Sequence, residues 1–450
     1  MKRIYIWGLV MMALAVSSCK LGKKYTRPEL DLPENIDGVQ GDTTSVSGIH
    51  WSELYQDTVL QNLIRQTLEY NKNLQAAAAR VKEMMEGKRI SNADLYPKID
   101  AQVVGEYKDA ASTSETYGGK GLLSWELDIW GKLRWGNQAA LADYLGSVAG
   151  QRALRITLIA QVAQAYFELT ALDQEYAIVK QTLAARQEGV RLARLRFEGG
   201  LTSETSLRQA QVELARTQTL IPDLEKNIRM KENQIALLAG QYPGPTQRGQ
   251  GLEQQALPAT LPVGLPSQLL ERRPDIVQAE YKLRAAHAKV GIAFTSLFPK
   301  ITLTGKAGLE SSSLSDFLKS PYYFFGGELL EPIFNMGKNR AKLRAAKAAR
   351  EQEVYAYQQT VLTAFSEVSN ALIASSKSRE IRESRKKLEQ ASRSALDLAT
   401  LQYINGITNY LDVLDAQRSY FDAQIGLNNA IRDELLATVQ LYKVLGGGDE

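Results

Sequence analysis

The tetrapeptide Tyr96-Pro97-Lys98-Ile99 returns as Phe298-Pro299-Lys300-Ile301, 202 positions further along the chain. Gly131-Lys132 returns as Gly337-Lys338 with an offset of 206. The same offset of 206 is then kept by the pairs Val162/Val368, Ala165/Ala371, Leu195/Leu401, Gly200/Gly406, Thr202/Thr408, Ala210/Ala416, Gln211/Gln417 and Gly240/Gly446. A register that stays constant over so long a stretch indicates an internal duplication, so two copies of one structural unit are expected.

Each copy contains a very long stretch that favours a helix. Between Gly337 and Gly406 the sequence has neither Gly nor Pro, which predicts a rod of roughly 100 Å at the helical rise of about 1.5 Å per residue. In the first copy, apolar residues from Val162 to Phe197 recur with a heptad spacing, and a neighbouring row contains Leu172 and Val179. Two adjacent rows predict a helix that packs against a neighbour on each side, as in a closed ring of coiled coils.

Before each long helix the sequence alternates with a period of two, which is typical of strands. The alternation predicts β-hairpins over residues 97–129 and 299–334, and it places Leu303 and Thr304 on opposite faces. Membrane strands have about 9–11 residues and one apolar face, although a half-buried soluble hairpin alternates in the same way. Four strands cannot close a barrel, since about eight is the smallest number. Membrane strands would therefore have to come from several chains.

These elements predict the organisation of the chain. In each repeat a helix precedes the hairpin, and a long helix and a return helix follow it, so each chain supplies four rod-length columns. The predicted segments are a signal peptide at 1–18, a lipidated, extended N-terminal segment at 19–56, a first repeat at 57–240, a Pro-rich linker at 241–266, a second repeat at 267–445 and a C-terminal tail at 446–450.

The N-terminus has the features of a bacterial export signal. Met1-Lys2-Arg3 is basic, and the apolar stretch that follows to Val16 is too short to span a bilayer. The run Val16-Ser17-Ser18-Cys19 resembles a lipobox, and Cys19 is the only cysteine of the chain. We therefore expect cleavage before Cys19 and lipidation of its thiol; the alternative is an ordinary signal peptide followed by an unmodified cysteine.

The composition argues against an enzyme. His50 and His287 are the only histidines, so neither a His-based triad nor a metal cluster is expected. Gly446-Gly447-Gly448 lacks the lysine of a phosphate-binding loop. The formal net charge of +4 is too small to favour a nucleic-acid partner. No catalytic residue, cofactor or metal is therefore expected.

Several strings of the sequence resemble the TolC-like outer-membrane factor family, in particular its NodT-type efflux lipoproteins. The most specific strings are Leu270-Glu271-Arg272-Arg273-Pro274-Asp275-Ile276, Phe298-Pro299-Lys300-Ile301 and Tyr410-Leu411-Asp412-Val413-Leu414-Asp415-Ala416-Gln417. The resemblance implies a homotrimer in which a twelve-stranded β-barrel in the outer membrane continues into a twelve-helix α-barrel in the periplasm. It also implies the exit duct of a tripartite efflux pump, joined through a periplasmic adaptor to an inner-membrane transporter.

The resemblance further implies roles for residues near the helical tips. Asp412 and Asp415 are spaced to share one helix face, and with Tyr403 and Thr408 they are expected to line a periplasmic aperture. The alternative is that the two aspartates only complement the helix dipole. The residues expected to dock the adaptor are Gly199, Gly200, Leu201, Thr202, Asn405, Gly406 and Ile407.

Two alternative functions stay open at this point: a periplasmic coiled-coil scaffold without a pore, and an outer-membrane channel of a protein-secretion system. The alternating hairpins favour a channel, because a scaffold has no use for paired strands of membrane length. No residue pattern indicates which small molecules such a channel exports.

Overall fold

The computed structural model describes residues 20–33, 49–108, 114–255, 257–258, 266–331 and 335–447. Cys19 and the predicted signal peptide lie outside the described residues. The chain divides into two compact units, the first made of Met1–Asp31, Ala78–Gly150 and Asp275–Thr360, the second of Leu32–Ala77, Gln151–Pro274 and Val361–Glu450. Within the described ranges, no helix has both the length and the hydropathy needed to cross a membrane.

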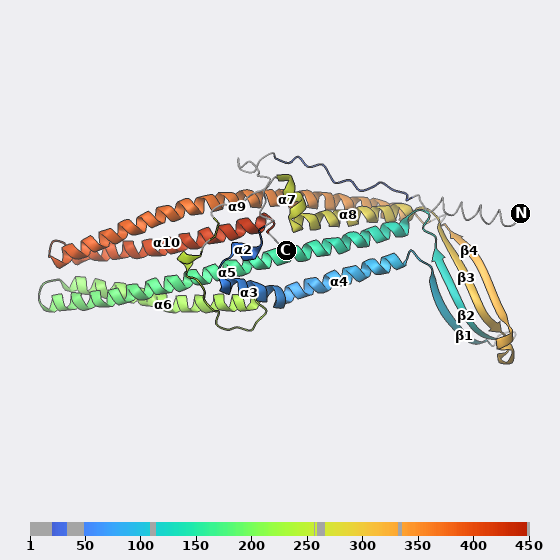
Figure 1. Cartoon of the computed structure of the whole chain (residues 1–450), viewed down its shortest axis with the longest axis horizontal. Helices are drawn as coiled ribbons and strands as arrows, with labels where there is room; N and C mark the ends of the chain where they lie inside the picture. The colour runs from blue at the N-terminus through green and yellow to red at the C-terminus, as the bar shows by residue number, and fades with distance from the viewer. Residues whose placement is uncertain are drawn as a thin grey trace. The chain divides into compact units, whose positions relative to one another are not determined.

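The first unit contains a four-stranded antiparallel sheet in the order β1-β2-β3-β4 (Figure 1). Its strands are β1 (Lys98–Lys108), β2 (Ser114–Glu126), β3 (Lys300–Ser311) and β4 (Pro321–Leu330), and the 3-10 helix η3 (Leu314–Lys319) connects the last two. The two hairpins are thus joined through β2 and β3, which leaves β1 and β4 as the edges of the sheet within the chain.

The register of the sheet aligns the sequence alternation across all four strands. Ile99 pairs with Leu123, Leu123 with Gly305, and Gly305 with Phe325, so these positions share one face. The same face carries Ala101, Val103, Leu303, Ala307, Tyr323 and Leu329, whereas the other carries Asp100, Gln102, Lys120, Thr304, Lys306 and Glu310. Ile99, Val103, Tyr323 and Phe325 on the apolar face are 76–88% exposed, so the described chain leaves most of this face uncovered.

The helices of the first unit are α8 (Pro274–Thr295) and parts of α4 (Lys72–Ala93), α5 (Lys132–Glu198) and α9 (Lys338–Ile404). Trp135 is buried with Ala139 and Ala288. A Cβ atom at Gly291 would lie 2.3 Å from the Trp135 ring, so the close packing of α5 on α8 requires glycine at this position.

The first described residues of the N-terminal segment, which follow Cys19, pack against these helices. The Trp135 indole donates a hydrogen bond to the carbonyl of Leu21 at 2.7 Å. Further along, Arg27 forms an ion pair with the nearly buried carboxylate of Glu280 at 2.6 Å. The segment is therefore part of the folded first unit.

The second unit contains α2 (Trp51–Leu54), α3 (Thr58–Tyr70), α6 (Glu204–Leu238), η2 (Leu252–Gln254), α7 (Pro266–Arg272), α10 (Tyr410–Val444) and the remaining parts of α4, α5 and α9. Residues 51–54 were expected to be extended, but they form a helix because Trp51 and Leu54 are buried in the core. Other large side chains of this core are Tyr55, Leu60, Ile64, Tyr166, Phe167 and Tyr442.

The structure repeats the duplication of the sequence. The helices α5 and α9 both have 67 residues, and α6 and α10 both have 35. Each helix expected before a hairpin is interrupted once, at Asn71 and at Arg273. The Asn71 amide donates to the carbonyl of Leu238 at 2.8 Å, and the Arg273 guanidinium donates to that of Val444 at 3.0 Å. Both interruptions thus bind the end of the return helix of their own copy.

Candidate functional site

The two helical hairpins end in tight turns that depend on glycine. Gly200 has φ of 71° and Gly406 has φ of 74°, a left-handed conformation that glycine adopts without strain. The amide of Leu201 donates to the carbonyl of Arg196 at 2.8 Å, and that of Ile407 donates to Gln402 at 2.9 Å. These are the bonds of a Schellman motif, which ends a helix by satisfying its last carbonyls.

The predicted docking residues lie at the surface of these turns. Leu201 is 73% exposed and Ile407 is 74% exposed, so each turn presents an exposed aliphatic side chain at its tip. Gly199, Gly200, Asn405 and Gly406 are exposed beside them, and Thr202 is half-buried. An exposed aliphatic side chain flanked by polar groups suits a contact with another protein.

The aspartates predicted to line the aperture do not cap their helix. Asn409 is the N-cap of α10, and its side chain accepts hydrogen bonds from the amides of Leu411 and Asp412 at 2.8 and 3.2 Å. The exposed carboxylate of Asp412 accepts a hydrogen bond from the Thr408 hydroxyl. Asp412 still lies in the first turn of α10, where a carboxylate complements the helix dipole, and its side chain is exposed.

Asp415 lies beside a cation that the sequence analysis did not single out. Its side chain is 81% exposed, and one oxygen lies 3.2 Å from a guanidinium nitrogen of Arg418 on the same helix. The spacing of three residues between the two would have indicated this pair from the sequence. Arg418 therefore reduces the net negative charge of this face.

Arg418 also reaches a buried carboxylate on another helix. Its second terminal nitrogen donates to Glu213 of α6 at 2.8 Å. Glu213 is 1% exposed and also lies near Arg186 of α5, at 3.3 Å, and Arg216, at 3.1 Å. We call these four residues the Glu213 cluster; it joins the α5–α6 hairpin to α10.

Electrostatics keeps Glu213 ionised. Burial by itself would raise the pKa of this carboxyl, but the hydrogen bond from Arg418 and the charge of Arg186 bring the pKa below its ordinary value. A buried charge is stable only when it is paired in this way. Sequence reasoning missed Glu213 and Arg186 because a helix periodicity does not show which charged residues of two distant helices will meet.

Tyr403 belongs to an apolar cluster that also joins the hairpins. Its ring centroid lies 5.3 Å from that of Tyr410, and the Arg196 guanidinium lies 4.5 Å from the Tyr403 ring. Burial raises the pKa of Tyr410 to about 12. Tyr403 is thus half-buried in the packing of the tip, between Arg196 of α5 and Tyr410 of α10.

The described residues offer charged groups and exposed surfaces. Among the described residues, no group of three or more His, Cys, Asp or Glu side chains could hold a metal ion. The features that distinguish the chain are two exposed tips, an acidic face near one of them and a sheet with one bare apolar face. These are the features of a membrane-associated assembly.

The chain belongs to the outer membrane efflux protein family, whose model matches residues 63–241 and 265–447. It is 33% identical to the outer membrane protein OprJ of Pseudomonas aeruginosa, over 98% of this chain and 95% of that protein. It is 30% identical to SilC of Salmonella typhimurium, described as a probable outer membrane lipoprotein, over 100% of this chain and 99% of that protein.

A solved structure of the same kind is similar over almost its full length. The open state of the MtrE outer membrane channel of Neisseria gonorrhoeae has a TM-score of 0.90 and 29% identity, covering 96% of this chain and 99% of that one. The protein is therefore an outer-membrane exit duct of a tripartite efflux system, in a family of channels rather than enzymes. The family expected from the sequence is confirmed, and a pore-free scaffold is not consistent with it.

Proposed function

We propose that three copies of the chain form a passive export channel for small molecules. The three sheets close a twelve-stranded β-barrel in the outer membrane, and the helices form a twelve-helix tunnel through the periplasm. In this proposal the segments predicted from the sequence act as the parts of one duct, with residues 57–240 and 267–445 as its two repeats.

The observation that carries the proposal is the four-stranded sheet. It has one bare apolar face and strands of 10 to 13 residues, the length that crosses a bilayer when tilted. Within the chain β1 and β4 have open edges, which expose unpaired backbone groups. Pairing β1 of one copy with β4 of the next would satisfy these groups and close the sheet, as a membrane requires.

The tips carry the proposed partner contacts. Leu201 and Ile407, with the adjoining turn residues, bind a periplasmic adaptor that connects the duct to an inner-membrane transporter. Asp412 and Asp415 of three copies line the aperture of the tunnel, and Tyr403 and Thr408 support it through the contacts described above. The exposure of both carboxylates and both aliphatic tips supports these assignments.

The N-terminus anchors the duct to lipid through Cys19. The position of Cys19 after the signal sequence supports this assignment, and so does the description of SilC as a lipoprotein. Mass spectrometry of the mature N-terminus is the direct measurement. An unmodified Cys19, or cleavage at another residue, would refute the lipid anchor and leave the channel proposal standing.

The channel itself is tested with the full chain purified in detergent. Light scattering should give the mass of three chains, and the same preparation should conduct ions in planar bilayers. A single-chain mass together with the absence of conductance would overturn the trimeric channel. A trimer that does not conduct would instead support a channel closed at its tips. Variants of the Glu213 cluster then distinguish the two cases, because they should open a closed pore and should have no effect where no pore exists.

A further inference from the structure

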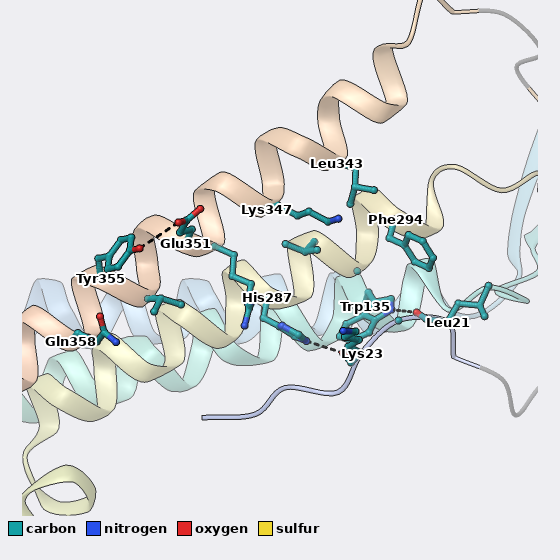
Figure 2. A pocket seen from close by; sticks show the side chains of 15 residues that line it. Leu21, Lys23, Trp135, His287, Phe294, Leu343, Lys347, Glu351, Tyr355 and Gln358 are labelled. Carbon is teal, nitrogen blue, oxygen red and sulfur yellow. Dashed lines mark hydrogen bonds between the residues drawn. The ribbon is translucent and has the colours of Figure 1, made fainter. Parts of the chain in front are cut away.

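The first unit contains a cavity of about 1020 Å³ between α8, α9 and the N-terminal segment (Figure 2). This volume is in the range of small-molecule sites. Figure 2 shows Phe294 and Leu343 at one end of the cavity and Tyr355 and Gln358 at the other. The N-terminal segment forms one wall, since Leu21, Gly22 and Lys23 also line the space.

The cavity is apolar at the end nearest the sheet. Phe294 is the last residue but one of α8, which ends five residues before β3 begins, and Leu343 lies in the second turn of α9. Trp135 adds its ring at the same end, near the start of α5, and is held there by the hydrogen bond to Leu21. The walls at this end offer a surface for hydrocarbon.

Two cations of α9 lie further from the sheet. Lys347 and Arg350 follow Leu343 on α9 by four and seven residues, so they lie roughly 6 and 10 Å further along the helix. Lys23 lines the cavity from the opposite wall, where its carbonyl accepts a hydrogen bond from the His287 ring at 2.9 Å. Apolar and cationic side chains of α9 thus follow one another along the cavity, and Lys23 lies beside Trp135 on the opposite wall (Figure 2).

Among the described residues, these three cations have no acidic partner. Within the described part of the chain, Lys23, Lys347 and Arg350 form no ion pair, and Nε of Arg350 is buried without a hydrogen-bond acceptor. Glu351 is the one carboxylate of the described lining, and it accepts a hydrogen bond from Tyr355 at 3.4 Å. The lining therefore carries an excess of positive charge.

The sequence around the cavity adds to this positive charge. Residues 335–350 contain six Lys or Arg side chains and no Asp or Glu. Burial lowers the pKa of His287, and the charges of Arg350 and Lys20 lower it further, against the hydrogen bond to Lys23. An uncharged His287 leaves the lysines and the arginine as the charged groups that an anion would meet.

We infer that the cavity binds an anionic phospholipid of the membrane that holds the sheet. The phosphate lies among Lys23, Lys347 and Arg350, and an acyl chain lies along Trp135, Phe294 and Leu343, directed toward the sheet. The order of apolar and cationic side chains along α9 matches the orientation of a lipid whose chains enter the bilayer. The inference rests on the proposed membrane position of the sheet.

The test measures lipid bound to the full chain in detergent by native mass spectrometry, with phosphatidylglycerol and phosphatidylcholine of identical acyl chains. The wild type should retain phosphatidylglycerol in preference to phosphatidylcholine. Removing each cation should weaken binding about fivefold, so Lys347→Gln with Arg350→Gln should weaken it roughly 25-fold. Lys347→Arg with Arg350→Lys preserves the charge and should bind as the wild type does.

Lys386→Gln with Lys387→Gln is the matched control, because both residues are exposed cations of α9 in the second unit. The inference would be overturned if the control bound phosphatidylglycerol as weakly as Lys347→Gln with Arg350→Gln does, or if the wild type bound the two lipids equally. Loss of the bound lipid in Cys19→Ser would assign the cavity to the protein's own acyl chain and would also overturn it. Conductance in planar bilayers tests the channel separately, so failure of the proposed function is distinguishable from absence of a lipid site.

Discussion

The Arg418 guanidinium on α10 donates a hydrogen bond of 2.8 Å to the buried carboxylate of Glu213 on α6. This contact ties the return helices of the two repeats near their tips. Arg186 of α5 lies 3.3 Å from the same carboxylate. The Glu213 carboxylate thus pairs with cations from two other helices, α5 and α10. Separation of the hairpins would have to break this buried pair.

Arg418→Met should therefore destabilise the packing of the hairpins. Glu213 would lose the hydrogen bond from Arg418 but keep Arg186 and Arg216 as neighbours. The cost should therefore lie below the value of about 3–5 kcal/mol that is typical when a buried charge loses its sole partner. The melting temperature of the detergent-solubilised protein should fall, and open-channel current should rise. Arg208→Met removes an exposed pair with Glu204 and should change little; equal effects of the two variants would contradict a special role of Arg418.

The contribution of Glu213 should depend on pH in one direction. Because the folded-state pKa of Glu213 lies below its unfolded value, ionised Glu213 stabilises the protein above the unfolded pKa of about 4.3. That contribution is lost as the pH falls through the folded pKa. The difference in melting temperature between wild type and Glu213→Gln should be constant near neutrality and should shrink below about pH 4.3; a gap that widens on acidification would contradict this.

The two faces of the sheet should tolerate charge differently. Leu303→Arg places a cation on the apolar face and should cost roughly 2–4 kcal/mol near the bilayer midplane. Thr304→Arg places it on the polar face and should be tolerated. The measurement is the yield of heat-resistant oligomer in outer membranes, and equal yields would refute the assignment of the apolar face to lipid.

The acidic face near the second tip should select cations. Asp412→Ala with Asp415→Ala should lower cation selectivity, because like charges around a narrow mouth attract counter-ions. The turn should survive, since Gly406 and the Asn409 cap remain. Reversal potentials across a salt gradient measure the effect, with Asp223→Ala on α6 as an exposed acidic control. An unchanged cation preference would place the constriction elsewhere.

Gly189 should not accept a side chain. A Cβ atom at this position of α5 would lie 2.8 Å from the Tyr410 hydroxyl, so Gly189→Ala should lower stability by about 1–3 kcal/mol through overpacking. Adding Tyr410→Phe removes the clashing oxygen and should restore part of the loss. Thermal unfolding of the two single variants and the double variant measures the coupling; additive effects would show that the two residues do not meet.

The sequence by itself determined the duplication, the long helices and which residues of each strand share a face. Offsets such as that between Gly200 and Gly406 are properties of the chain, and a left-handed turn needs glycine wherever it occurs. The alternation around Leu303 likewise defines two faces once a strand forms, because successive side chains point to opposite sides. Local geometry is sufficient for each of these conclusions.

Only the tertiary structure decided which distant groups meet. The pairing of Arg418 with Glu213, the hydrogen bonds of Asn71 and Arg273 to the ends of the return helices, and the cavity beside Trp135 join residues far apart in sequence. Periodicity shows which face of a helix is apolar, but it does not determine the axial register in which two helices pack. The partner of a buried charge depends on that axial register, since a shift of one turn, about 5.4 Å, exceeds the length of a hydrogen bond.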